Sequence, residues 1–102
     1  MSDIPAGVKV EPVFLVEAQY TAEAAERRPA VRSEHLVNVA RLRNEGVIIE
    51  AGAYSDGLTS SVLLVRADDA AAALAVARRD IYVKAGVWGE ISARPFGRVT
   101  SE

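Results

Sequence analysis

Apolar and polar side chains alternate along residues 13–20, the first strongly patterned segment of the chain. A period of two is typical of a β-strand with one buried face, and β-branched and aromatic residues favour the same structure. We therefore predict a strand here. Its apolar face would carry Phe14, Val16, Ala18 and Tyr20, and its other face the polar Glu17 and Gln19.

The pattern changes to a helical period after this strand. We predict that Thr21 caps a short helical piece that stops near Pro29, because proline removes a helical hydrogen bond. A longer helix is then expected over residues 31–45, and Gly46 would supply the left-handed residue at its end.

This longer helix places its apolar residues on one narrow stripe when successive residues are rotated by about 100°. The only histidine of the chain, His35, lies in the middle of the stripe and should therefore point toward the sheet. The stripe consists of Val31, His35, Val39 and Leu42, with Leu36 and Ala40 beside it, and Glu34, Asn38 and Arg41 are expected on the opposite side.

Three further strands are predicted from apolar runs that are bounded by turn residues. Pro95 marks the last of them as an edge strand or an irregular one, because proline cannot donate a hydrogen bond to a neighbouring strand. The three strands would cover residues 47–54, 61–66 and 88–99, and the turn Ser55-Asp56-Gly57 separates the first two.

A second helix is expected between the last two strands. Asp68 would cap it, its alanine-rich interior favours helix up to about Arg79, and residues 80–86 would connect it to the last strand. The resulting order, β-α-β-β-α-β, is that of the ferredoxin-like fold. We therefore predict an α+β fold with a four-stranded antiparallel sheet and two helices on one face.

The length of 102 residues allows one domain. Residues 12–99 would form it, with residues 1–11 as a flexible lead-in and residues 100–102 as a tail. The sheet face away from the helices would gather polar groups such as Glu17, Glu50 and Glu90. A face that is both polar and apolar must meet water, a ligand or a second subunit, and we expect a homodimer.

Composition and charge exclude several classes of protein. The 12 Lys and Arg against 14 Asp and Glu give a net charge of -2, which argues against nucleic acid or a membrane surface as partner. Without cysteine there is no disulfide or thiolate, and one histidine cannot build a multi-histidine metal cage. We expect no metal and no cofactor. The chain lacks a membrane span and a signal-peptide pattern, so a cytoplasmic protein is expected.

His35 is the first candidate for chemistry, because an inward-pointing imidazole can act as a general base near neutral pH. Such a base needs an acceptor for its other ring nitrogen, and Asp80, just after the second helix, is the best candidate. The alternatives are a core histidine bonded to a backbone carbonyl and an ordinary turn aspartate.

Other candidates surround this pair. Arg32 precedes His35 by one helical turn and would hold an anionic substrate oxygen, or simply pair with an acid. Tyr82 and Trp88 would either pack in the core or wall a flat apolar ligand. The end of the second strand offers further residues, which are either turn residues or part of a substrate pocket: Tyr54, Ser55 and Asp56.

Five short motifs follow one another at defined intervals: Arg32-Ser33-Glu34-His35-Leu36, Glu45-Gly46, Ala51-Gly52, Asp80-Ile81-Tyr82 and Pro95-Phe96. Each is short, but the ordered set, over about residues 12–98, resembles the YCII-related (YciI-like) family. Two departures are visible. Ile81 stands where the family often has proline, and the N-terminal extension has no counterpart.

The resemblance implies a ferredoxin-like fold of the dimeric α/β-barrel type and an active site that falls on His35 and Asp80, with the family's arginine on Arg32. Relatives include a dehydrochlorinase of chlorinated hydroxyquinols, and muconolactone isomerases share the fold. We therefore expect a cofactor-independent lyase or isomerase whose substrate is a small aromatic, quinone or lactone-type molecule. The alternatives are a non-catalytic small-molecule-binding or accessory module and, less favoured, a heme-handling or monooxygenase barrel.

Overall fold

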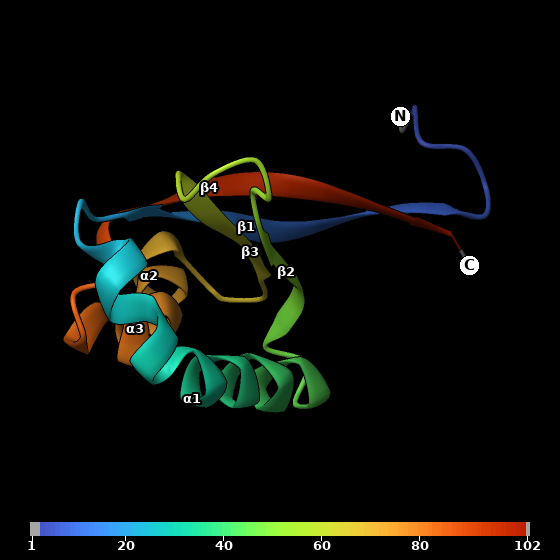
Figure 1. Ribbon diagram of the computed structural model, residues 1–102. Helices are drawn as coiled ribbons and strands as arrows, with labels where there is room; N and C mark the ends of the chain where they lie inside the picture. The colour runs from blue at the N-terminus through green and yellow to red at the C-terminus, as the bar shows by residue number, and fades with distance from the viewer. Residues whose placement is uncertain (1–2, 102) are drawn as a thin grey trace.

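The computed structural model describes residues 3–101 (Figure 1). The predicted βαββαβ order is confirmed, with one short helix added before the last strand. The elements are β1 (Val8–Tyr20), α1 (Ala24–Asn44), β2 (Ile48–Ala53), β3 (Ser60–Val65), α2 (Ala70–Arg78), α3 (Ile81–Lys84) and β4 (Trp88–Ser101).

The four strands form one antiparallel sheet in the order β2-β3-β1-β4. The helices lie together on one face of it, as Figure 1 shows. The predicted fold class is therefore confirmed. The position of β4 at an edge also explains how the sheet accommodates Pro95, because an edge strand leaves one row of backbone groups without a partner.

Alternate residues of the central strands build the core beneath the helices. Val16 of β1 and Val65 of β3 are completely buried. In α2, the buried residues Ala73 and Ala77 are small, so the helix can pack closely on β1 and β4. The period-two pattern of β1 thus places the predicted apolar face against the helices.

α1 is one continuous helix, and the predicted stop near Pro29 is wrong. The ring of Pro29 is exposed, so the cost is mainly one lost backbone hydrogen bond, and the core contacts of Val31 and its neighbours hold the helix together. Thr21 does not cap the helix, because its hydroxyl donates to the carbonyl of Gly86 at 2.5 Å. Gly46 ends the helix with a φ of 79°, as predicted.

Two local predictions around α2 need correction. Asp69 rather than Asp68 is the N-cap, and its carboxylate accepts the amide of Ala72 at 2.8 Å. The predicted connection over residues 80–86 contains α3, which begins after Asp80. A helix of four residues is too short to show a periodic pattern of apolar residues, so the capping aspartate, Asp80, is its only signal in the sequence.

The outer strands are longer than predicted. Residues 8–11 of the expected lead-in and the described part of the expected tail are paired strand, while Met1, Ser2 and Glu102 lie outside the described residues. Residues 8–12 of β1 pair with residues 97–101 of β4 beyond the end of β3. This two-stranded segment, which we call the arm, projects from the body of the molecule (Figure 1).

Candidate active site

The candidate site is built on a contact between His35 and Asp80, which lie 45 residues apart in the sequence. His35 lies on the buried side of α1, and Asp80 is the N-cap of α3. The imidazole Nδ1 and the carboxylate Oδ1 are 2.8 Å apart, and both side chains are nearly fully buried. Because an ionised carboxylate only accepts hydrogen bonds, Nδ1 carries the proton in this pair.

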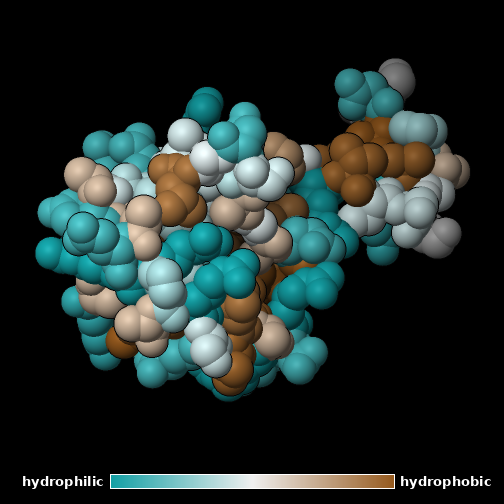
Figure 2. All heavy atoms as spheres, viewed as in Figure 1, coloured by the Kyte–Doolittle hydropathy of each residue, from teal (hydrophilic) through white to brown (hydrophobic). Residues whose placement is uncertain are grey.

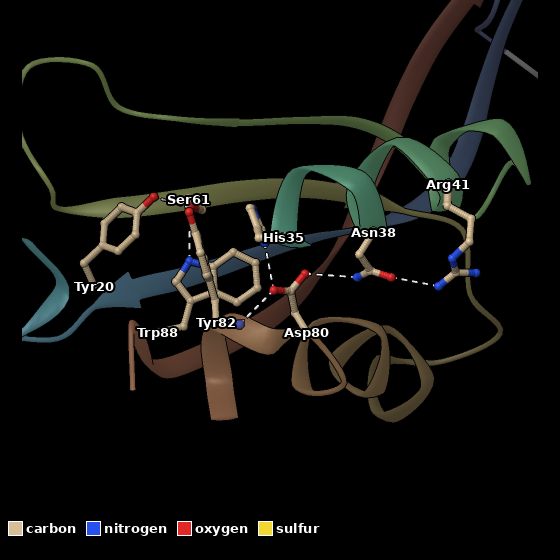
Figure 3. Close-up of polar contacts among 8 residues, drawn as sticks. All are labelled: Tyr20, His35, Asn38, Arg41, Ser61, Asp80, Tyr82 and Trp88. Atoms are coloured by element: carbon tan, nitrogen blue, oxygen red, sulfur yellow. Dashed lines mark hydrogen bonds and ion pairs between the residues drawn. The ribbon is translucent and has the colours of Figure 1, made fainter. Parts of the chain in front are cut away.

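Asp80 receives two further hydrogen bonds. Oδ1 accepts the backbone N–H of Tyr82 at 2.9 Å, and Oδ2 accepts Nδ2 of Asn38 at 3.1 Å (Figure 3). Burial acts to raise the pKa of Asp80, but the donors, led by His35, outweigh burial and hold this pKa below its ordinary value. The carboxylate is therefore ionised and fixed in orientation at neutral pH.

Asn38 lies beside His35, so the prediction that it faces away is wrong. Its amide oxygen accepts Nη2 of Arg41 at 2.7 Å, which orients its amide nitrogen toward Asp80. Residues three apart on a helix are neighbours, so the spacing between His35 and Asn38 could have indicated that both side chains reach the same site.

Two aromatic rings enclose the imidazole. The ring of Tyr82 stacks on that of His35 with centroids 3.7 Å apart and planes 7° apart. Trp88 meets the two rings edge-on, at 5.1 and 5.3 Å. The imidazole is thus held in place by the stacked ring of Tyr82 and by the hydrogen bond from Nδ1 to Asp80. The other ring nitrogen, Nε2, has no hydrogen-bond partner among residues 3–101.

A chain of hydrogen bonds runs from Trp88 to Tyr20 (Figure 3). Trp88 Nε1 donates to Oγ of Ser61 at 3.2 Å, and Ser61 donates to the hydroxyl of Tyr20 at 3.0 Å. Because Ser61 donates in the second of these bonds, the hydroxyl proton of Tyr20 is available for another acceptor. No local pattern predicts the chain, because its members come from three different strands.

A cavity of about 180 Å³ opens beside the imidazole. It brings together four of the predicted residues, and Asp80 lies behind the ring of His35 rather than on the wall. Arg28, one turn before Arg32, was missed, although its spacing places it on the same side of the helix. The polar and aromatic residues on the wall are Tyr20, Arg28, Arg32, His35, Ser61, Tyr82 and Trp88.

The turn after β2 lies apart from this cavity. Tyr54, Ser55 and Asp56 are exposed, and none of them lines the wall beside His35. Tyr54 and Ser55 border a neighbouring surface hollow, which also touches Arg28 and Arg32.

The YCII-related domain model matches residues 13–97, which include every residue of the His35 cavity. The chain belongs to the YCII-related family. Among its curated YCII-related relatives, Protein YciI of Escherichia coli is 32% identical over 96 residues, which cover 85% of this chain and 98% of that protein. An uncharacterised protein of Haemophilus influenzae is 32% identical over 95 residues, 84% of this chain and 97% of that one.

The fold of this YCII-related chain is also found in a solved structure of 5-chloro-2-hydroxyhydroquinone dehydrochlorinase (TftG) from Burkholderia phenoliruptrix, in complex with 2,5-dihydroxybenzoquinone. The TM-score is 0.67 at 18% identity, and the match covers 80% of this chain and 90% of the other. This likeness establishes the shared fold.

Residues 3–101 contain no group of three His, Cys, Asp or Glu side chains that could hold a metal ion. In the same part of this YCII-related chain, no helix has the length and apolar character needed to cross a membrane.

Proposed function

We propose that this protein is a small lyase or isomerase that needs no cofactor and uses His35 as its general base. One observation carries the proposal: Nδ1 is bound to an ionised, fixed carboxylate, while Nε2 is left free in a ring that lines a cavity. A carboxylate in this position selects the tautomer with a basic Nε2 and stabilises the imidazolium that forms. Asp80 therefore acts as a positioning residue.

The reaction would begin with transfer of a proton from an acidic carbon or a phenol oxygen of the substrate to Nε2. The electron pair left behind moves into the conjugated system as an enolate or dienolate, and Arg32 stabilises its negative oxygen. In an elimination, a leaving group such as chloride departs with its bonding pair from a tetrahedral carbon. On a chlorinated phenol, the ring carbon that bears the chlorine therefore first takes up the proton, and a second phenol proton is lost as chloride leaves and the quinone forms. In an isomerisation, His35 returns the proton to a different carbon.

The cavity supports a small, planar substrate of the aromatic, quinone or lactone type. Its volume is about 180 Å³, and Tyr20, Tyr82 and Trp88 give it flat aromatic walls. The dehydrochlorinase with the same fold acts on a chlorinated hydroxyhydroquinone, which makes that molecule the first substrate to test.

The test is chloride release from 5-chloro-2-hydroxyhydroquinone by the wild-type protein and by His35→Ala. We expect the substitution to lower turnover by about 10²–10⁴-fold, the usual contribution of a general base, with an unchanged circular dichroism spectrum. Full activity in His35→Ala would exclude the mechanism. Binding of such molecules without turnover by the wild-type protein would instead favour the non-catalytic binding module.

We also propose that two copies of the chain associate through the arm. Val10 and Val99 are cross-strand partners in the arm, and 45% and 72% of their surfaces are exposed. Figure 2 shows apolar atoms gathered on this projection. An isolated two-stranded ribbon is marginally stable in water, and the radius of gyration of 15.0 Å exceeds the roughly 13 Å of a compact domain of this length. A second copy would cover these side chains.

A further inference from the structure

Two buried polar atoms in the described part of the chain lack a hydrogen-bond partner: Nε of Arg28 and the hydroxyl of Tyr82. Both residues line the cavity beside His35, although they come from α1 and α3. An unsatisfied buried polar group is costly, so native structures rarely keep one without a use. Two such atoms on residues that share one cavity wall point to a ligand that satisfies them.

The charge around these atoms indicates what kind of ligand group fits. Arg28 and Arg32 line the cavity, and no Asp or Glu among the described residues does. Burial raises the pKa of Tyr82, while the side chain of Arg28, which lies against the Tyr82 hydroxyl, and the more distant charge of Arg32 oppose this rise. The hydroxyl is therefore protonated at neutral pH, and its own proton can be donated to a ligand. The guanidinium of Arg28 also lies 5.7 Å from the ring centre of Tyr20, a contact that restricts its position.

We propose that Arg28 and Tyr82 form an oxyanion subsite, at which a carboxylate or phenolate oxygen of the ligand accepts hydrogen bonds from Arg28 Nε and the Tyr82 hydroxyl. This inference rests on the proposed function, because the same cavity holds the substrate. It adds that the substrate belongs to the class of small organic anions. The substrate is an anion before it reacts. Arg28 and Tyr82 bind its existing charge, whereas Arg32 is left to meet the charge that develops during proton transfer.

The ring of Tyr82 links the subsite to the base. It stacks on His35 through its face and presents its hydroxyl as the orphaned donor at its end. A flat molecule anchored by its oxyanion at this hydroxyl would be held at a fixed distance from the imidazole. Arg28 and Tyr82 would therefore determine which small aromatic molecules place an acidic hydrogen near Nε2.

Binding of a matched pair of probes tests the subsite without any turnover. 4-Fluorobenzoate and 4-fluorobenzamide have nearly the same shape, but only the first carries a negative charge. Their affinities can be followed by fluorine NMR and by the fluorescence of Trp88, the only tryptophan, which lies on the cavity wall. We expect the wild-type protein to bind the benzoate at least tenfold more tightly, because a hydrogen bond to a charged group carries that much binding energy.

The variants separate the subsite from its surroundings. Arg28→Gln should abolish the preference for benzoate, Tyr82→Phe should reduce it about two- to tenfold, and Arg28→Lys should restore only part of it. Arg78→Gln removes an exposed arginine of α2 and should leave it unchanged. The affinity of 4-cyanophenol, measured at pH values above and below its own pKa, shows whether the subsite binds a phenolate as it binds a carboxylate.

His35→Gln distinguishes failure of the subsite from failure of the proposed function. The preference for benzoate should survive in this variant even though its turnover is lost, because the oxyanion is bound by other residues. Equal affinity for the two probes, no binding of benzoate, an undiminished preference in Arg28→Gln, or a preference that vanishes in His35→Gln would each overturn the inference.

Discussion

Two carboxylates, Asp80 in the cavity region and Glu11 in the arm, are each held by more than one donor, but in opposite surroundings. Asp80 is 3% exposed and receives hydrogen bonds from an imidazole, a backbone amide and a carboxamide. Glu11 lies at the surface and pairs with Arg66 at 2.6 Å and with Arg98 at 3.0 Å.

The difference shows what each carboxylate can do. The Asp80 contacts are shielded from water and salt, so they can fix one tautomer of a buried ring. The Glu11 pairs tie β1 to Arg66, the residue after β3, and to β4 where the arm begins, and solvent screens them. We therefore attribute chemistry to the first carboxylate and structural anchoring to the second.

The largest expected effect comes from breaking the buried pair. Asp80→Asn keeps the size of the side chain but removes the charge that stabilises an imidazolium, so turnover should fall by about 10²–10⁴-fold. Asp69→Asn is the matched control, because Asp69 caps α2 without touching a histidine. Steady-state rates of the two variants test the contrast, and equal rates in both would remove Asp80 from the mechanism.

Substitutions in the arm should change the association constant of the dimer rather than the chemistry at His35. Val99→Lys places a charge on its exposed apolar surface, and we expect the association constant to fall about tenfold or more. Val37→Lys is the control, because Val37 is 68% exposed on α1, outside the arm. Sedimentation equilibrium measures both variants, and a dimer that is unaffected by Val99→Lys would place the interface elsewhere.

A stability measurement tests whether the hydroxyl of Tyr82 on the cavity wall lacks a hydrogen-bond partner in the absence of ligand. Tyr82→Phe removes a buried hydroxyl that has no partner but keeps the ring stacked on His35. In the absence of ligand, the free energy of unfolding should rise by about 1–3 kcal/mol. Tyr54→Phe, at an exposed tyrosine, should change it by less than about 0.5 kcal/mol. Urea denaturation gives both values, and a destabilised Tyr82→Phe would mean that the hydroxyl is already satisfied.

The smallest effect should appear in the pH dependence of stability. Hydrogen bonds from Arg66 and Arg98 lower the pKa of Glu11, and the pKa of Asp80 is also lowered. A lowered folded-state pKa stabilises the fold above the unfolded-state value of about 4, and this stabilisation is lost as the pH falls through the folded-state value. Both Asp80→Asn and Glu11→Gln should therefore flatten the loss of stability in acid.

Salt separates the two contributions. At about 1 M salt, screening acts over roughly 3 Å, so the contribution of Glu11 should shrink while that of Asp80 persists. Denaturation at several pH values, at low and high salt, measures this. A contribution of Asp80 that is as sensitive to salt as that of Glu11 would contradict the contrast between buried and exposed carboxylates.

The fold could be predicted because its elements carry their periods locally. The alternation along β1 and the apolar stripe of α1 indicated the order of elements and the inward direction of His35. Pro29 misled the prediction because helix propensity does not report the core contacts that hold α1 together. The arm was missed because residues 8–12 and 97–101 become a ribbon only through pairing with each other.

The site was predictable only in part. The place of Asp80 just after the second helix, and then the family resemblance, indicated this residue. The helical spacing from His35 contained Arg32, Asn38 and, one turn further, Arg28. The link from Trp88 through Ser61 to Tyr20 joins three strands and has no signature within any of them. The orphaned hydroxyl of Tyr82 is a property of its surroundings, which no local pattern describes.

The tautomer of His35 decides whether the cavity holds a general base. It is the only histidine, so a nitrogen-15 NMR spectrum of the labelled protein contains a single pair of ring nitrogens to assign. For the neutral ring, we predict a protonated Nδ1 and an unprotonated Nε2, and a loss of this preference in Asp80→Asn. A neutral ring with its proton on Nε2 in the wild-type protein would leave no base facing the cavity and would exclude His35 as the general base.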